Sequence, residues 1–546
     1  MHKLNVSFDK NVLVSYDSLH QDSVNLFREV KRINSVLKSK GFISSYESIV
    51  ELDSNSYQCN FVLGDLYEWE KLRFSAFLSE LLTTEPRLGN LPITEQYIKE
   101  SMEEILIACE NKGYPFAEVF FDSTAIKEGR ISSIMKVNTK SIVKIDSIIV
   151  KGGLRTSLNY VTKQIGIEKG DVYNQRLIND VDRKISNIPF VETIRSPEVY
   201  FTKGKATLVL YLKDNAASRF DGIIGLNPDE TTGRIGFVGD LKINLLNTFK
   251  RGENIVLNWE QAKTQTQNYL VRFDYPFLLR TRLGMASRLN YFRQDTSFAN
   301  LDASFGLSFF LDERQQVGLS VQVVESNSLL ESENNTQSIP STNSLQTLYY
   351  GVNYSYNSLD YLLNPRRGLQ IAAKLQSGSK TVQKDGNNES FDYESLQEKT
   401  TQVKTDVSIS YFIPIWKKAT VLTRIQSGNI FGDNLFVNEL YQIGGLKTLR
   451  GFNQQSIFAS NYAIGTAEFR YLFERNSAIF AYFDYGFYEN KSINDFATDT
   501  PFGFGVGTNF QTKAGIFSLT YGLGQQKGNP LLIRNGKVHF GFVSLF

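Results

Sequence analysis

The sequence has little cysteine and histidine, and no excess of charge of one sign. Its 2 cysteines, Cys59 and Cys109, lie far apart, and with only 3 histidines in 546 residues neither a disulfide framework nor a metal site is indicated. The 59 basic and 57 acidic side chains nearly cancel, which argues against nucleic acid as a partner. No nucleophile elbow or Walker loop is visible. We therefore expect a protein that is not an enzyme and that holds no metal or cofactor.

Long hydrophobic runs are also missing. No run of about 18 apolar residues occurs, so a membrane-spanning helix is not expected. Transmembrane β-barrels escape this test, because their strands alternate apolar residues facing lipid with polar residues facing the lumen. The 39 glycines, 40 phenylalanines and 27 tyrosines beside only 12 prolines fit such a barrel.

The first eight residues lack the apolar core of a secretory signal peptide. A barrel with domains in the periplasm needs export across the inner membrane. Two explanations therefore stay open at this point: the chain is a mature or trimmed form, or its start is misplaced.

Residues 1–215 predict helices and strands that repeat about every 75 residues. Two predicted helices end at Gly41 and Gly113, where a helix terminus needs a left-handed residue. Each predicted helix is followed by a hairpin. The predicted hairpin strands are 45–51 with 58–63, 117–122 with 131–137, and 193–200 with 206–212. On the first helix the apolar positions predicted to share one face are Val24, Phe27, Val30, Ile33 and Leu37.

These repeats predict three small α+β domains, at residues 1–65, 66–140 and 141–215. The third is the clearest, with a strand at 144–151, a turn at Gly152-Gly153 and a helix at 158–165. A second helix follows, with Asn174 as its N-cap. Three unrelated α+β units are the alternative reading of the same pattern.

From residue 216 to residue 546 the sequence predicts an all-β domain. Helical periodicity gives way to alternating runs of about ten residues separated by turns. The predicted strands are 219–227, 231–246, 253–262, 266–275, 280–294, 299–311, 314–326, 346–358, 368–377, 402–414, 418–430, 460–474, 476–488, 501–510, 514–523 and 536–546. These sixteen strands predict an antiparallel transmembrane barrel with both ends in the periplasm. The long links 327–345, 378–401, 431–459, 489–500 and 524–535 fall on the opposite, extracellular side. The exception is the longish link around 359–367, which falls on the periplasmic side.

Charged residues within two neighbouring predicted strands indicate which face is the lumen. Glu468 and Asp484 each lie on the face opposite to a row of apolar residues. Because a charge on the lipid face is costly, both carboxylates are expected to face the lumen. In 502–507 large residues alternate with glycine, and we assign Phe502, Phe504 and Val506 to the lipid side. No helix follows this glycine run, so a phosphate loop is not indicated there.

The link 431–459 contains Leu449-Arg450-Gly451-Phe452. An unpaired charge buried away from water costs several kcal/mol, and the planar guanidinium suits carboxylates. We predict that this loop folds back into the barrel and that Arg450 pairs with the lumenal carboxylates. Gly451 would let the backbone approach the wall, and Phe452 would be an apolar anchor. A solvated loop arginine is the alternative.

Several of these features resemble the BamA/TamA outer-membrane assembly family, which includes two-partner secretion translocators. Leu449–Phe452 matches its Arg-Gly-Phe/Tyr motif, and residues 483–486 match its Phe-x-Asp-x-Gly strand. The third repeat closely resembles a POTRA domain, the periplasmic module carried in front of such barrels, whereas the second resembles one moderately and the first weakly. Residues 364–368 look like the family's Pro-x-Arg-Gly turn. The resemblance implies that Asp484 holds Arg450 inside the barrel, with Glu468 as second partner.

The end of the chain is similar to the family's C-terminal barrel signal. His539, Gly541 and Phe546 stand at the positions of its polar residue, glycine and final aromatic residue. Ser544 departs from the pattern, because an apolar residue is expected there.

The resemblance implies a location in the bacterial outer membrane, with the N-terminal domains in the periplasm. An assembly factor would receive unfolded outer-membrane proteins at exposed strand edges and template them where the first and last barrel strands meet. Its partners would be the lipid bilayer, these clients, and accessory periplasmic or lipoprotein subunits. Two alternatives are a two-partner secretion translocator that exports one polypeptide, and a passive channel or surface antigen.

Overall fold

The computed structural model describes residues 2–81, 93–228, 235–263, 266–329, 341–361, 364–383, 397–512, 515–528 and 531–545. The chain forms two compact units. The N-terminal unit holds Met1–Ile149, Glu168–Asn179 and Glu198–Val209. The barrel unit holds Val150–Ile167, Asp180–Pro197 and Leu210–Phe546.

The three N-terminal repeats share one strand order. In the first, β1 pairs in parallel with β4, which pairs antiparallel with β3; in the second, β5, β7 and β6 do the same. The third has the matching order β8-β10-β9. The elements of the first two repeats are β1 (His2–Phe8), β2 (Leu19–His20), α1 (Ser23–Ser39), β3 (Tyr46–Asp53), β4 (Ser56–Val62), β5 (Glu68–Phe74), α2 (Ala76–Leu81), α3 (Glu95–Asn111), β6 (Glu118–Lys127) and β7 (Arg130–Asn138). Those of the third are β8 (Lys144–Lys151), α4 (Leu158–Ile165), α5 (Gln175–Asn179), α6 (Val181–Ser186), β9 (Val191–Thr202) and β10 (Lys205–Asp214). The boundaries 1–65, 66–140 and 141–215 stay predictions.

Several local predictions in these repeats are confirmed. Gly41 and Gly113 both have a φ of +95°, as expected after a helix end. Asn174 caps α5 by accepting a hydrogen bond from the backbone N–H of Leu177 at 3.1 Å. Among the described residues, no helix is both long enough and apolar enough to span a membrane.

The predicted face of the first helix was partly wrong. Val30, Ile33 and Leu37 of α1 are buried as predicted, but Val24 and Phe27 are exposed and Leu26 takes their place in the core. The buried stripe of α1 is therefore narrower than the apolar pattern of the sequence. A further strand was expected in each repeat, but no residues were assigned to β1 or β5, which pair in parallel with the last strand of their repeats.

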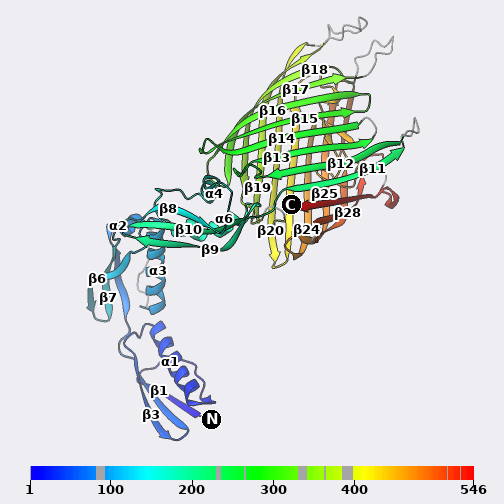
Figure 1. Cartoon of the computed structure of the whole chain (residues 1–546). Coiled ribbons are helices and arrows are strands. Elements are labelled where there is room, and N and C mark those ends of the chain that lie inside the picture. Colours follow the sequence, from blue (N-terminus) through cyan, green and yellow to red (C-terminus); the bar gives the residue numbers. More distant parts are fainter. Residues whose placement is uncertain are drawn as a thin grey trace, which may run out of the picture. The chain divides into compact units, whose positions relative to one another are not determined.

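The second half of the chain forms the predicted antiparallel barrel (Figure 1). Its described strands are β11 (Arg219–Pro228), β12 (Ile235–Leu246), β13 (Asn254–Lys263), β14 (Thr266–Leu278), β15 (Leu283–Gln294), β16 (Phe298–Phe310), β17 (Gln315–Ser328), β18 (Leu345–Asn357), β19 (Gly368–Val382), β20 (Lys399–Trp416), β21 (Ala419–Phe431), β24 (Asn461–Glu474), β25 (Ser477–Ser492), β26 (Asp495–Asp499), β27 (Phe502–Gln511), β28 (Ile516–Gln525) and β29 (Lys537–Leu545). Strands β26 and β27 pair with successive parts of β25 and so share one barrel position. The described strands therefore occupy sixteen positions, as predicted.

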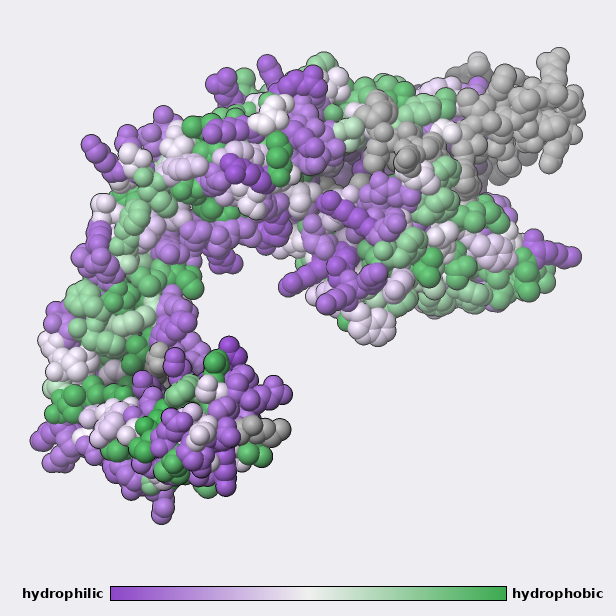
Figure 2. All heavy atoms as spheres, turned by 60° about the horizontal axis from the view of Figure 1, so that its bottom comes forward, coloured by the Kyte–Doolittle hydropathy of each residue, from purple (hydrophilic) through white to green (hydrophobic). Residues whose placement is uncertain are grey.

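The two faces of the barrel wall differ as the alternation predicts. On β24 and β25 the outward residues Phe469, Phe483 and Tyr485 are exposed, whereas Ile464 and Thr466 are buried on the lumenal face. Phe504 and Val506 also face outward. Apolar surface accordingly spreads over the barrel wall in Figure 2. An apolar outer face of this kind suits contact with lipid.

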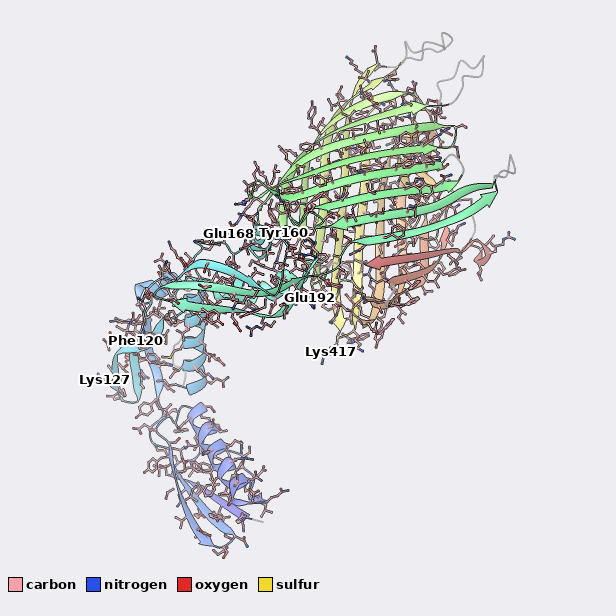
Figure 3. The ribbon with its side chains drawn as sticks, viewed as in Figure 1. Phe120, Lys127, Tyr160, Glu168, Glu192 and Lys417 are labelled. Atoms are coloured by element: carbon pink, nitrogen blue, oxygen red, sulfur yellow. The ribbon has the colours of Figure 1, made fainter. Side chains whose placement is uncertain are left out.

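Part of the third repeat packs on the barrel strands and turns within the barrel unit. The ring centroid of Tyr160, on α4 (Figure 3), lies 5.3 Å from that of Phe190 and 5.7 Å from that of Phe277 on β14. Burial raises the pKa of the Tyr160 phenol, which keeps it neutral. Lys184, on α6, donates to the carbonyl of Ile165 at 2.6 Å and lies 3.3 Å from Glu313, in the β16–β17 turn. These contacts fix α4 and α6 to the barrel.

We predict that Tyr160→Ala loosens α4 while the barrel stays folded. Truncating a buried aromatic side chain removes about 3–5 kcal/mol of packing, so amide hydrogen exchange in α4 should accelerate by orders of magnitude. Tyr160→Phe keeps the ring and is the matched control, with nearly unchanged exchange. Equal protection in the Ala and Phe variants would show that this contact does not hold α4.

Candidate functional site

The loop between β21 and β24 lies inside the barrel. Its short strands β22 (Tyr441–Ile443) and β23 (Ile457–Ala459) pair with each other and form a stem, which was not predicted. The loop packs in an apolar cluster with Ile464, a lumenal residue of β24. The other buried members of this cluster are Ile443, Leu449, Phe452, Ile457 and Ala459. The loop is therefore part of the barrel interior rather than a solvated surface loop.

Arg450 at the tip of this loop binds Asp484 through a fork of hydrogen bonds. Its Nε donates to Oδ2 and its Nη2 to Oδ1, both at 2.7 Å. The backbone N–H of Arg450 also donates to Oδ2 at 3.1 Å. Arg450 is 7% exposed and Asp484 0%, so this charge pair is shielded from water. Bidentate pairing of this kind fixes orientation as well as charge.

Glu468 is the second carboxylate partner, as predicted. Nη1 of Arg450 donates to Oε2 of Glu468, and Arg470 donates to Oε1 of the same carboxylate. Thr466 donates to Oδ1 of Asp484 at 2.8 Å. Arg424, on β21, reaches the same cluster and donates to the hydroxyl of Thr466 at 3.4 Å. The two carboxylates thus lie among three arginines, two of which bind them directly. The acceptors of both carboxylates are occupied by these donors, which is an arrangement that holds a loop in place.

An aromatic ring completes the arginine pocket. The guanidinium carbon of Arg450 lies 3.6 Å from the ring centroid of Tyr482, the residue of β25 opposite Glu468. An arginine over a desolvated aromatic face gains cation–π attraction.

Glycines at the loop tip and on the facing strands allow the loop backbone to approach the barrel wall closely. Gly451 has a φ of +91°, and a Cβ there would lie 2.5 Å from the carbonyl of Leu523 on β28. A Cβ at Gly503 would lie 1.9 Å from the carbonyl oxygen of Arg450, and one at Gly524 would lie 2.7 Å from the Phe452 ring. Gly503 belongs to the glycine row predicted to turn away from lipid, and at this position the row makes room for the loop, a role that the sequence alone did not indicate.

A second buried ion pair, which was not predicted from the sequence, holds the part of the loop nearest β21. Lys380, on β19, is 0% exposed, and its Nζ lies 3.0 Å from Oε1 of Glu439 in the turn η2 (Val437–Glu439). It also donates to the carbonyl of Asn434 at 2.9 Å. Gln402 donates to Oε2 of Glu439 at 2.6 Å. Lys380 was overlooked because the predicted strand ended at residue 377, before the end of β19.

Polar contacts with further barrel strands surround this second anchor. Asn438 donates to the carbonyl of Asn343 at 2.8 Å and to the hydroxyl of Ser326 on β17. Asn300, on β16, donates to the carbonyl of Asn438 at 2.9 Å. The loop therefore crosses the lumen from the wall at β16–β20 to the wall at β24–β28.

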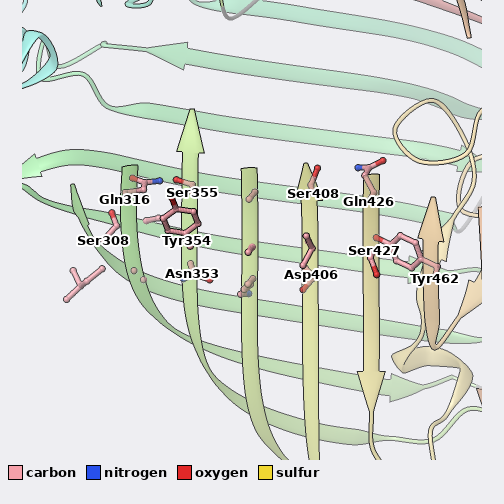
Figure 4. Close-up of a pocket in the computed structure, with 18 residues that line it drawn as sticks. Ser308, Gln316, Asn353, Tyr354, Ser355, Asp406, Ser408, Gln426, Ser427 and Tyr462 are labelled. Atoms are coloured by element: carbon pink, nitrogen blue, oxygen red, sulfur yellow. The ribbon is translucent and has the colours of Figure 1, made fainter. Parts of the chain in front are cut away.

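A hollow of about 400 Å³ is lined by residues of strands β15–β21 and β24 (Figure 4). Neutral polar side chains dominate its labelled lining: Ser308, Gln316, Asn353, Ser355, Ser408, Gln426 and Ser427. Lys374 and Asp406 add one charge of each sign. Tyr441 of the loop stem donates to Asp406 at 2.8 Å, so the loop borders this hollow.

Two further predicted motifs, the C-terminal barrel signal and the Pro-x-Arg-Gly turn, can be located in the structure. Gly541 and His539 lie on β29, opposite Ser518 and Thr520 of β28, whereas Phe546 lies outside the described residues. In the Pro-x-Arg-Gly turn, Asp360 accepts hydrogen bonds from the backbone N–H groups of Arg366 and Arg367 at 3.0 and 3.2 Å.

We predict that Arg450→Ala and Asp484→Ala each release the loop while the barrel stays folded. Arg450→Ala removes the guanidinium that binds Asp484, and Asp484→Ala leaves Arg450 only Glu468, which Arg470 also binds. Removing one partner of a buried ion pair costs about 3–5 kcal/mol, so amide exchange across residues 441–459 should accelerate. The double variant should lose less protection than the sum of the two single variants, because the pair is broken only once.

Arg470→Ala is the matched control, since Arg470 binds Glu468 but does not belong to the loop. It should affect exchange in the loop less than Arg450→Ala does. Strict additivity of the two single variants would show that Arg450 and Asp484 do not act as a pair.

Three comparisons relate the chain to known proteins. Residues 247–542, just over half of the chain, match the Omp85 superfamily domain. The outer membrane protein assembly factor BamA of Neorickettsia risticii (strain Illinois) is 20% identical over 371 residues, which are 66% of this chain and 47% of that protein. The chain thus spans about half the length of this relative.

Two solved structures share the fold. CdiB from Acinetobacter baumannii has a TM-score of 0.54 and 13% identity, with 97% of this chain and 100% of that chain covered. CdiB from Escherichia coli has a TM-score of 0.54 and 14% identity, with 96% and 97% covered. The predicted resemblance is confirmed at the level of the superfamily: the chain belongs to the Omp85 superfamily, as an outer-membrane β-barrel protein with N-terminal periplasmic domains.

Proposed function

We propose that this chain is an assembly factor that inserts other β-barrel proteins into the outer membrane. Unfolded clients would bind at its periplasmic repeats and add their strands where the barrel closes. The proposal assigns it no enzymatic activity and no cofactor. Partners of this function are the bilayer, the unfolded clients, and accessory periplasmic or lipoprotein subunits.

This proposal rests on the weak pairing between β11 and β29, the two strands that close the barrel. Strands β11 and β29 pair at only two described positions, Arg219 with Leu545 and Phe220 with Ser544. By contrast, β11 pairs with β12 at ten positions, and β28 with β29 at seven. Among the residues that the structure describes, the seam between β11 and β29 therefore leaves most of the two strand edges unpaired. Free edges of this kind template the addition of another strand.

The N-terminal repeats offer further edges for client binding. Strand β3 lies at one edge of the first sheet and β6 at one edge of the second. On β3, the side chains of Tyr46, Val50 and Leu52 are exposed. A client segment could add to such an edge through backbone hydrogen bonds, with its alternate side chains on this apolar face.

The lumenal loop argues against a passive channel or surface antigen. Two buried ion pairs hold the loop across the lumen, and a freely conducting pore has no need of them. Export of one polypeptide through the lumen is the second candidate, because the polar hollow of Figure 4 could accompany an extended chain. Such export would require the loop to leave at least one of its anchors.

A disulfide across the seam should block client insertion. The paired positions suggest Phe220→Cys with Ser544→Cys. In lipid vesicles that contain the oxidised protein, insertion of an unfolded barrel protein should fall to background, and reductant should restore it. The native thiols should not interfere, since Cys59 and Cys109 are buried and burial raises the pKa of the Cys59 thiol to about 11.

The control disulfide joins Leu257→Cys and Val271→Cys, which face each other on the neighbouring strands β13 and β14. It introduces the same chemistry at an already closed strand pair and should leave insertion unchanged. Full insertion by the seam-locked protein would overturn the assembly proposal.

A further inference from the structure

A cavity lies where the start of α4 meets two neighbouring turns of the barrel. Its volume is about 360 Å³, within the range of about 300–1,000 Å³ that small-molecule sites occupy. The turns join β12 to β13 and β14 to β15, and the backbone N–H of Ser157, just before α4, donates to the carbonyl of Lys250 at 2.7 Å. Because α4 belongs to the third periplasmic repeat, the cavity lies at the periplasmic end of the barrel.

Tyr275 places this cavity on the lipid-facing side of the barrel wall. It lines the cavity and alternates along β14 with Tyr269 and Val271, whose side chains are exposed on the outer face. Its ring centroid lies 6.3 Å from that of Phe273, and its hydroxyl accepts a hydrogen bond from Nη1 of Arg251 at 3.4 Å. A tyrosine with an apolar body and a polar tip is typical of the membrane–water interface. The cavity therefore lies at the depth of the lipid headgroups.

The charged side chains of the cavity are both positive. Arg251 and Arg280 line it, and none of its described lining residues is acidic. Within the described part of the chain, neither guanidinium makes an ion pair. The neighbouring Lys250 differs in this respect, because its Nζ lies 3.7 Å from Asp214. Two guanidinium groups without a carboxylate suit a phosphate, which accepts hydrogen bonds from their planar forks.

An exposed leucine lies beside these arginines. Leu279 lines the cavity and is 85% exposed. Its backbone φ is +52°, and those of Phe277 and Arg280 in the same turn are +55° and +62°. Left-handed backbone is unfavourable for such residues, so this turn presents Leu279 outward at an energetic cost. Phe249, in the neighbouring β12–β13 turn, is also exposed. Apolar side chains in such positions are stabilised when lipid chains cover them.

We propose that this cavity binds the headgroup of an anionic phospholipid from the periplasmic leaflet of the outer membrane. Arg251 and Arg280 bind the phosphate, and the acyl chains lie over Leu279 along the outer wall. A zwitterionic headgroup binds less well, because its ammonium group meets the same two positive charges. The bound lipid thus joins the two turns on which α4 rests. The inference rests on the location of the barrel in the outer membrane and not on the proposed function.

The test measures lipid binding by the full chain. Delipidated protein in detergent is titrated with phosphatidylglycerol, and native mass spectrometry counts the bound lipids. The parent protein should bind a first lipid more tightly than further ones. R251Q combined with R280Q should weaken this first step by about thirtyfold, since each basic residue near an anionic lipid contributes about fivefold. Phosphatidylcholine should bind the parent more weakly than phosphatidylglycerol does.

Two further variants separate this site from general attraction to a basic surface. K417Q combined with K418Q removes two positive charges from the exposed β20–β21 turn, where Figure 3 labels Lys417, and should leave the first step unchanged. L279N keeps both arginines and places asparagine, which tolerates left-handed backbone, at this position. It should weaken phosphatidylglycerol by about tenfold through the lost apolar contact. Slower migration on an unheated gel identifies any variant that has not folded.

Each outcome decides for or against the site. Equal affinity in the parent and the R251Q/R280Q variant, or an equal loss in K417Q/K418Q, would overturn it. Glycerol phosphate that binds the parent as tightly as phosphatidylglycerol would indicate a site for small anions and overturn lipid as the occupant. Equal affinity for phosphatidylcholine and phosphatidylglycerol would overturn the preference for an anionic headgroup.

Discussion

A guanidinium that is shielded from water needs carboxylate partners, and the barrel wall around Arg450 supplies two of them. The register of β24 and β25 places Thr466 opposite Asp484 and Glu468 opposite Tyr482, so both acceptors, a hydroxyl donor and an aromatic face lie on two adjacent strands. The next strands are reduced to glycine where the loop backbone touches them. The desolvation cost of these charges is offset because each one meets an opposite charge and its hydrogen-bond partners within the same pocket.

The loop is firmly held inside the barrel, whereas the seam in the barrel wall is weakly paired. The lumen is crossed by a loop with a buried ion pair at each end, Arg450 with Asp484 and Lys380 with Glu439. The barrel wall, in contrast, closes through only two described residue pairs between β11 and β29. A barrel whose lumen holds an anchored loop and whose β11–β29 seam is weakly paired favours entry of a client strand through the wall. It is less suited to free passage along the axis.

Much of this could be predicted because alternation along a strand is a local signal. Glu468 and Asp484 were placed in the lumen from the apolar residues beside them, and Arg450 followed from the need for a cation. The features that were missed depend on distant parts of the chain. Lys380 meets Glu439 only through the barrel register. Gly503 and Gly524 are needed only because the loop packs against them, and β1 forms a strand because β4 pairs with it.

The most direct test of assembly is a quantitative proteome of the outer membrane and the culture medium after depletion of this chain. The account predicts that many unrelated barrel proteins decline together in the outer membrane, because each needs a seam for its insertion. Selective loss of one large polypeptide from the medium, with the other barrels intact, would contradict it and indicate a dedicated translocator.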